Sequence, residues 1–157
     1  LSLHDALPIS AYFSIRAKAF DLRIMTGDLK MQMTEFNRIK ALDRGASPKD
    51  KDLMSALEVS MEMYQRGYRF INVDIQHSEA RRFSIKDGAL LPPFLAIDSL
   101  GETVADAVVA EREERPFTSL KDLQRRCKVS NTIIDLMKEL KCCGELPEDE
   151  QMSLFGA

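Results

Sequence analysis

Apolar residues recur at spacings of three and four over two long stretches of the chain, which predicts two amphipathic helices. The first stretch follows Asp28, a good N-cap, and Gly45 closes it; its apolar positions are Leu29, Met33, Phe36, Ile39 and Leu42. The second begins at Ser47-Pro48, where Ser can cap the helix and Pro suits its first turn, and Gly67 ends it. Its expected buried positions are Leu53, Leu57, Met61 and Tyr64. A shorter helix is expected before Gly27, after an apolar stretch at 11–15.

The pattern changes after Gly67. Residues 70–75 are typical of a strand, and residues 82–91 predict a hairpin around an Asp-Gly turn. Pro92-Pro93 ends this unit and is the best candidate for a domain boundary.

Three short helices are predicted beyond the prolines. They run from Leu100-Gly101 to about Glu114, from Ser119 to near Cys127, and from Ser130 to before Gly144. No internal repeat is evident. The expected fold class is therefore mainly α with a small β-hairpin (α+β).

Composition limits the class of protein. The chain has 157 residues, 45% of them hydrophobic and 30% charged, which suffices for one ordinary domain or two small ones. No segment approaches the ~20 apolar residues needed to cross a membrane. The net charge of −3 does not by itself indicate a nucleic-acid binder, but residues 121–128 carry four cations against Asp122 alone.

Neither metal nor disulfide chemistry is predicted. Three cysteines without CxxC spacing and only two histidines argue against a disulfide framework or a zinc site, and favour reduced cytosolic thiols. Asp74, Asp87 and Asp98 are isolated and suit caps and turns. No catalytic residue and no metal ligand are therefore expected in this chain.

The segment from Ala96 to Ala105 predicts a phosphate-binding turn. A helix-hairpin-helix motif places a Gly-hydrophobic-Gly turn before its second helix, so that backbone amides and the helix dipole meet a phosphate. Here Leu100 is the hydrophobic anchor and Gly101 the second glycine. Ser99 replaces the first glycine and Glu102 adds a negative charge, and both are expected to weaken binding. The candidate DNA-binding residues are Ser99, Leu100, Gly101, Thr103, Lys121, Arg125 and Arg126.

The end of the chain predicts a second binding element. Gln151 followed by Leu154-Phe155 is the pattern of sliding-clamp-binding peptides, in which two apolar side chains fill a pocket and the amide fixes the register. The acidic, proline-containing segment before it would keep the peptide off its own domain. A tail without function is the alternative.

Together these residues resemble the C-terminal region of the PolC-type DNA polymerase III alpha subunit of low-GC Gram-positive bacteria. The blocks that carry the resemblance are 11–17, Leu57-Glu58-Val59, Glu62-Met63, Arg66-Gly67-Tyr68, Ser78, Ala80, Phe83, Leu91-Pro92-Pro93-Phe94, Phe117, 122–126 and the QxSLF terminus. This sequence has Asp98 and Ser99 where the family has Pro-Gly. Residues 1–10 do not match the family and are set aside as a candidate foreign segment.

The resemblance implies a division into the end of the polymerase fingers region (11–93), a helix-hairpin-helix domain that binds duplex DNA (94–146) and a flexible sliding-clamp-binding tail (147–157). It implies that the parent is a DNA-directed DNA polymerase whose magnesium ions are bound by aspartates upstream, so the fragment alone should be inactive and hold no cofactor. The expected partners are primer-template duplex, the sliding clamp (beta subunit) and the upstream remainder of the polymerase, in the cytoplasm and without a membrane.

A stand-alone helical module that docks a protein partner and never touches DNA is the alternative. The low net charge, Ser99 and Glu102 favour it. Duplex binding at ~50 mM salt, where phosphate contacts are strongest, discriminates between the two. A small hydrolase or metalloenzyme lacks a His, Cys or Ser constellation to support it.

Overall fold

The computed structural model describes residues 3–149. The predicted clamp-binding residues Gln151, Leu154 and Phe155 lie outside this range. The first part of the chain is helical, and its elements are α1 (Leu3–Ile15), the 3-10 turn η1 (Ala17–Ala19), α2 (Leu22–Met25), α3 (Leu29–Leu42), the 3-10 turn η2 (Asp43–Gly45) and α4 (Pro48–Gln65).

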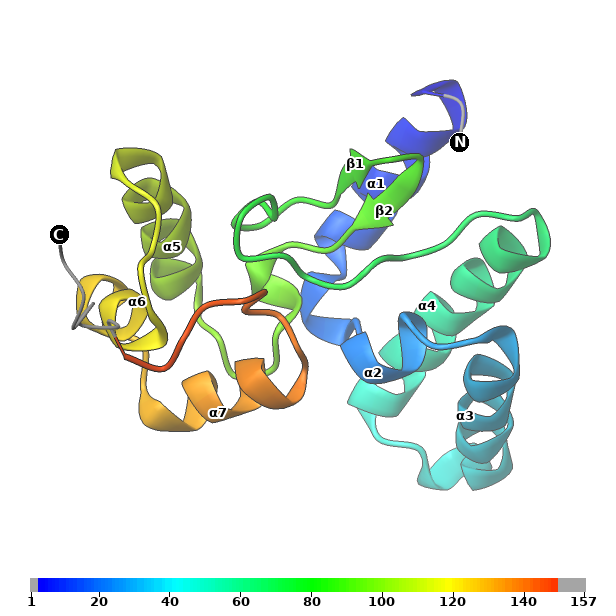
Figure 1. The fold of residues 1–157 in the computed structure, drawn as a ribbon. Coiled ribbons are helices and arrows are strands. Elements are labelled where there is room, and N and C mark those ends of the chain that lie inside the picture. Colours follow the sequence, from blue (N-terminus) through cyan, green and yellow to red (C-terminus); the bar gives the residue numbers. More distant parts are fainter. Residues whose placement is uncertain (1–2, 150–157) are drawn as a thin grey trace, which may run out of the picture.

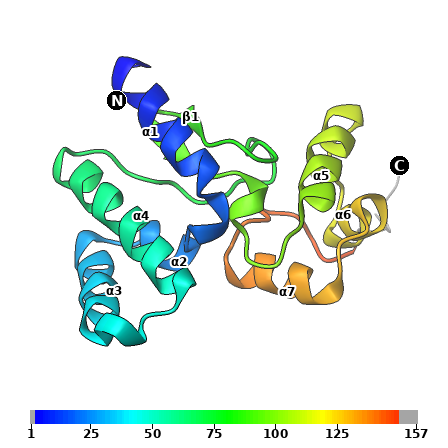
Figure 2. The same ribbon diagram turned by 180° about the vertical axis from the view of Figure 1, so that it is seen from behind.

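The second part contains a hairpin and three helices. Its elements are β1 (Ser84–Lys86), β2 (Ala89–Leu91), the 3-10 turn η3 (Phe94–Ala96), α5 (Glu102–Glu114), α6 (Leu120–Cys127) and α7 (Asn131–Glu139). Figures 1 and 2 show α2, α3 and α4 on one side of the molecule and α5, α6 and α7 on the other. The expected class, mainly α with a small β-hairpin, is confirmed.

Local signals placed most helix starts correctly. The Asp28 carboxylate accepts a hydrogen bond from the Met31 amide, and Ser47 and Asp50 form a reciprocal capping box. The Ser119 and Ser130 hydroxyls cap α6 and α7, and each accepts one hydrogen bond from an amide three residues later. The predicted hairpin also forms around Asp87 and Gly88, which have φ of 51° and 76°, in the left-handed region that this tight turn requires.

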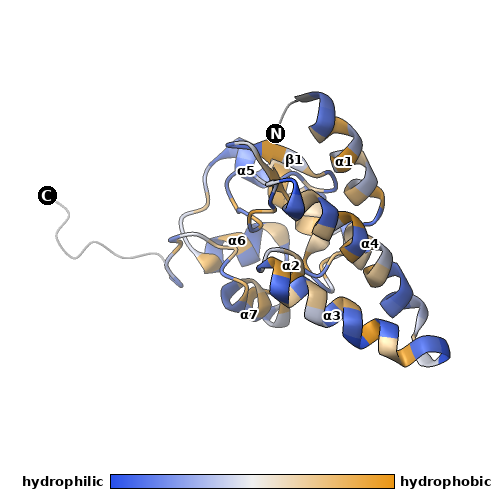
Figure 3. Ribbon diagram, turned by 90° about the vertical axis from the view of Figure 1, so that its right-hand side faces the viewer, coloured by the Kyte–Doolittle hydropathy of each residue, from blue (hydrophilic) through white to orange (hydrophobic). Residues whose placement is uncertain are grey.

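The buried face of α3 differs from the predicted stripe. Met33 and Leu42 are 49% and 41% exposed, whereas Gln32 is fully buried. The Gln32 side-chain amide donates to the Met25 carbonyl and accepts from the Ser60 hydroxyl. Its polar atoms are therefore hydrogen-bonded although the side chain is buried between α3 and α4. Figure 3 shows apolar and polar residues alternating along α3. A pattern that counts only apolar residues could not detect this buried polar pair.

The strand predicted at 70–75 is wrong. Only Phe70 forms a bridge, with Leu90, and the chain beyond it is irregular. The amide of Asp74 donates to the Ser78 hydroxyl and that of Ile75 to the Cys142 carbonyl, so no neighbouring strand is needed to satisfy them.

The N-terminal segment also differs from expectation. Residues 3–15 form one helix, where the sequence predicted only an apolar stretch from residue 11. Ala6 is buried, and the Ser10 hydroxyl donates to the Phe83 carbonyl at 2.5 Å. Within the first ten residues, Ala6 and Ser10 therefore contact the rest of the molecule.

One continuous core connects the parts of the chain before and after Pro93. Phe13, Phe20, Phe70 and Phe83 form a cluster of aromatic rings with centroids 4.8–6.1 Å apart, and buried residues of α5, α6 and α7 belong to the same core. The Arg112 guanidinium donates to the carbonyls of Ile75 and Ser78 at 3.0 and 2.8 Å, which fixes the loop of residues 74–79 against α5. Within residues 3–149 no helix is both long and apolar enough to span a membrane.

Candidate nucleic-acid interface

The candidate phosphate-binding turn, residues 99–101, lies between η3 and α5. It is called the first hairpin below and is distinct from the β-hairpin of β1 and β2. Ser99 has a φ of 63°, the left-handed conformation that the first glycine of the motif would adopt more easily. Leu100 is 3% exposed, and its amide donates to the Ile97 carbonyl. Gly101 is the N-cap residue of α5 and has no side chain that could accept a hydrogen bond. The amides of the first helical turn therefore receive no hydrogen bond from the cap residue's side chain. The turn thus combines a left-handed residue, a buried hydrophobic residue and a helix start without a capping side chain.

A second hairpin of the same conformation joins α6 to α7. Lys128 has a φ of 55°, Val129 is 3% exposed, and Ser130 caps α7 with φ −69° and ψ 156°, close to the −79° and 164° of Gly101. Lys128, Val129 and Ser130 therefore repeat the order of a left-handed residue, a buried residue and a helix cap found at Ser99, Leu100 and Gly101, but the Ser130 hydroxyl, unlike Gly101, accepts a hydrogen bond from an amide of the helix, that of Ile133.

The repeat continues into the two helices. Ala105 and Val108 of α5 are buried, as are Ile134 and Met137 at the corresponding positions of α7. Thr103 and Thr132 are both exposed in the first turn. Sequence reasoning missed Lys128, Ser130 and Thr132, because this turn contains no glycine; the shared order of turn, buried residue, cap and threonine is the signal that could have found them.

The structure separates the predicted DNA-binding residues into two groups. Ser99, Gly101 and Thr103 are exposed together at the first hairpin, with Leu100 buried as their anchor. The other group lies on α6, and consists of Lys121, Arg125 and Arg126.

The three cationic side chains of α6 differ in their exposure and in their ion pairs. Lys121 pairs with Asp149 at 2.5 Å and Arg125 with Asp122 at 3.0 Å, but both side chains are more than two-thirds exposed. The Arg126 side chain is only 8% exposed; it pairs with Glu111 and Asp122, and its guanidinium lies 4.6 Å from the Phe117 ring centre. In this position Arg126 holds α5 and α6 together.

Asp122 is the buried acceptor of this network. Burial raises the pKa of its carboxyl, but hydrogen bonds from the Thr118 amide, Arg125 and Arg126 outweigh that effect and hold the pKa at about 2. The carboxylate is therefore charged at neutral pH and offsets part of the positive charge of α6.

Glu102, which the sequence placed beside the candidate phosphate site, is paired. Arg81 approaches its carboxylate at 3.1 Å and that of Asp106 at 2.5 Å. The hydrogen bond from Arg81 lowers the pKa of Asp106, and all three side chains are about half exposed. Arg81 thus supplies a compensating positive charge at the start of α5.

A family model for the helix-hairpin-helix motif matches residues 67–151. The chain belongs to this helix-hairpin-helix family. The match begins before Pro92-Pro93 and includes both the β-hairpin and the two turns described above. The predicted division of the chain at residues 93 and 94 stays a prediction.

Curated relatives of this helix-hairpin-helix chain are PolC-type polymerases. The DNA polymerase III PolC-type of Caldanaerobacter subterraneus subsp. tengcongensis is 40% identical over 146 residues, which is 93% of this chain and 10% of the relative. Those of Streptococcus suis and Streptococcus pyogenes serotype M12 are 44% and 41% identical, over 97% of this chain and 10% of each relative. The resemblance to the PolC type is confirmed, and the chain spans about a tenth of the length of these relatives.

Proposed function

We propose that this chain is the segment of a replicative DNA polymerase that binds the backbone of duplex DNA through two hairpins. The observation that carries the proposal is the repeated backbone conformation at residues 99–101 and 128–130, each time at the start of a helix. Amide groups and the positive end of a helix dipole favour a phosphate at both places. Contacts of this kind carry no base-sequence information, so binding should be independent of sequence.

Titration of the full 157-residue chain with a fluorescent primer-template duplex tests this proposal. Fluorescence anisotropy should show binding at ~50 mM salt that weakens steeply towards ~200 mM, because each phosphate contact releases counterions. Equal binding to duplexes of different sequence is expected. No affinity at ~50 mM salt would favour the alternative, a helical module that binds only protein.

For the parent protein we propose DNA-directed DNA polymerase activity, supported by the names of the relatives. Among residues 3–149, no cluster of three His, Cys, Asp or Glu side chains could hold a metal ion. We place the magnesium-binding aspartates in the upstream remainder of the polymerase, and the whole protein in the cytoplasm, where bacterial DNA is replicated. A primer-extension assay with magnesium should detect no synthesis by this chain alone.

We further propose that the terminal residues Gln151, Leu154 and Phe155 bind the sliding clamp. The support is the sequence pattern alone, since these residues lie outside the described range. The double substitution Leu154→Ala/Phe155→Ala removes both apolar side chains and should abolish binding to the purified clamp in a pull-down assay. A double variant that retains the clamp as well as the parent chain does would contradict the assignment.

A further inference from the structure

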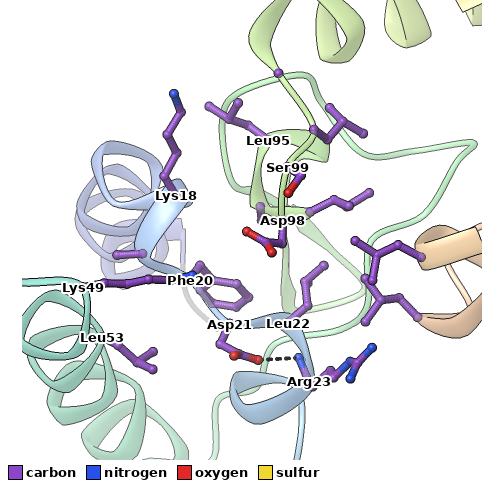
Figure 4. A pocket seen from close by; sticks show the side chains of 17 residues that line it. Lys18, Phe20, Asp21, Leu22, Arg23, Lys49, Leu53, Leu95, Asp98 and Ser99 are labelled. Carbon is purple, nitrogen blue, oxygen red and sulfur yellow. Dashed lines mark hydrogen bonds between the residues drawn. The ribbon is translucent and has the colours of Figure 1, made fainter. Parts of the chain in front are cut away.

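The first hairpin forms one wall of an open hollow of about 560 Å³ (Figure 4). The opposite walls come from the N-terminal half of the chain, from η1, α2 and the start of α4. Figure 4 shows Lys18 and Lys49 on one side of this hollow and Ser99 on the other, with Asp98 between Ser99 and Phe20. The hollow therefore joins the candidate phosphate-binding turn to residues far from it in the sequence.

Three cationic side chains lie in the otherwise largely apolar lining of the hollow, and two of these form no ion pair with any acidic side chain among the described residues. Lys18, Arg23 and Lys49 line it, against the acidic side chains Asp21 and Asp98. Arg23 forms an ion pair with Glu139, and Asp21 accepts hydrogen bonds from two amides of α2. Lys18 and Lys49 form no ion pair within residues 3–149 and are both exposed. Their charge is thus available to an anionic ligand.

Lys18 also connects the hollow to the start of α5. It lies between the hollow and a neighbouring depression that is lined by Arg81 and Glu102, the ion pair at the first turn of α5. A strand whose phosphate is held by the first hairpin would therefore meet Lys18 and Lys49 before it leaves the protein surface.

We propose that the hollow is an additional contact site for the DNA backbone, in which Lys18 and Lys49 bind phosphates of the strand that the first hairpin holds. The proposal rests on the proposed duplex-binding function and extends the interface beyond the helix-hairpin-helix turns to the N-terminal half of the chain. Lys18 and Lys49, which form no ion pair within residues 3–149, adjoin the hairpin and favour a polyanion over an apolar peptide, which would leave both charges uncompensated.

Salt-dependent duplex titrations of the double variant Lys18→Ala/Lys49→Ala test the proposal. The slope of log K against log salt should become shallower by about 2, since each phosphate contact contributes about 0.9. Affinity at ~100 mM salt should fall about tenfold or more. The control is Lys30→Ala/Lys40→Ala, which removes the same charge from exposed positions of α3 and should bind DNA like the parent chain.

Asp98→Asn supplies a test of opposite sign, because removal of its negative charge from the hollow should tighten binding severalfold. The proposal is overturned if the Lys18/Lys49 variant keeps the parent slope, or if the α3 control loses as much affinity. In either case, a loss of duplex affinity in the hairpin variant Gly101→Ala would leave the proposed duplex-binding function standing. A parent chain that does not bind DNA at all overturns both this proposal and the proposed function.

Discussion

At Gly101 the requirements of folding and of binding can be separated. Its φ of −79° is open to any residue, and a Cβ added there would meet no atom within 4 Å. The folded protein therefore does not need a glycine at this position. A phosphate that approaches the amides of the first turn of α5, by contrast, would meet the added methyl group, which, unlike the Ser130 hydroxyl at the second hairpin, has no hydrogen to donate to it.

The substitution Gly101→Ala should lower duplex affinity about tenfold, equivalent to ~1.4 kcal/mol, which is close to the contribution of one hydrogen bond to a charged group. The melting temperature should change little, because the lower capping preference of alanine is offset by its smaller loss of chain entropy on folding. Anisotropy titration and thermal denaturation measure the two effects. Gly45→Ala, also at a glycine with open space around it, is the matched control and should leave DNA binding unchanged.

Asp122 is the residue whose charge matters most for the packing of α5 against α6. Asp122→Asn removes the ion pairs with Arg125 and Arg126 and should reduce the free energy of unfolding by about 2 kcal/mol or more, as measured by urea denaturation at pH 7. Full parental stability in this variant would show that the network contributes nothing.

The same carboxyl predicts how stability changes with pH. Its folded-state pKa of about 2 is depressed from 3.8, so its contribution is fully present above the ordinary value and is lost as the pH falls towards 2. Urea titrations from pH 5 to pH 2 should show this loss in the parent chain and a smaller one in Asp122→Asn. Equal losses in both chains would assign the acid sensitivity to other groups.

At the scale of elements, the parts that the sequence predicted are those set by local interactions. The caps at Asp28, Ser47, Ser119 and Ser130 and the Asp-Gly turn are each decided within a few residues, and all of them form. The segment 70–75 has the composition of a strand, but distant partners such as Cys142 satisfy its amides, and no local pattern carries that information.

The candidate site was predictable only in part, for the same reason. The first hairpin contains the Leu-Gly pair that marks the motif, whereas Lys128, Val129 and Ser130 reproduce its conformation without a glycine. Arg126 looked like a surface cation in the sequence, yet its side chain lies between α5 and α6. Lys18 and Lys49 adjoin the hairpin only because the chain folds back on itself.

The cap of α7 allows charge and helix stability to be changed independently. Aspartate caps a helix about as well as serine, so Ser130→Asp should retain the fold, but its carboxylate should repel a phosphate at the second hairpin. We expect at least a tenfold loss of duplex affinity with an unchanged circular dichroism spectrum. Ser130→Asn, an equally good cap without charge, should bind like the parent, and a similar loss in this variant would point to disturbed structure.

At the scale of the whole molecule, binding has to arise locally, because the net charge of the chain is −3. Acidic residues are held in ion pairs at several places near the candidate interface, as with Arg81 between Glu102 and Asp106. The core that continues across Pro93 keeps the hairpins and the N-terminal lysines in one arrangement. The surface that we propose for DNA is therefore held in one arrangement within a chain that spans about a tenth of the length of its relatives.

The central claim is that both hairpins hold the DNA backbone, and a salt-dependent duplex titration of Gly101→Ala/Ser130→Asp beside the parent chain tests it most directly. We predict that the parent binds at ~50 mM salt with affinity that falls as salt rises, and that the double variant, still folded, loses about a hundredfold in affinity at ~50 mM salt. A double variant that binds as tightly as the parent would contradict it.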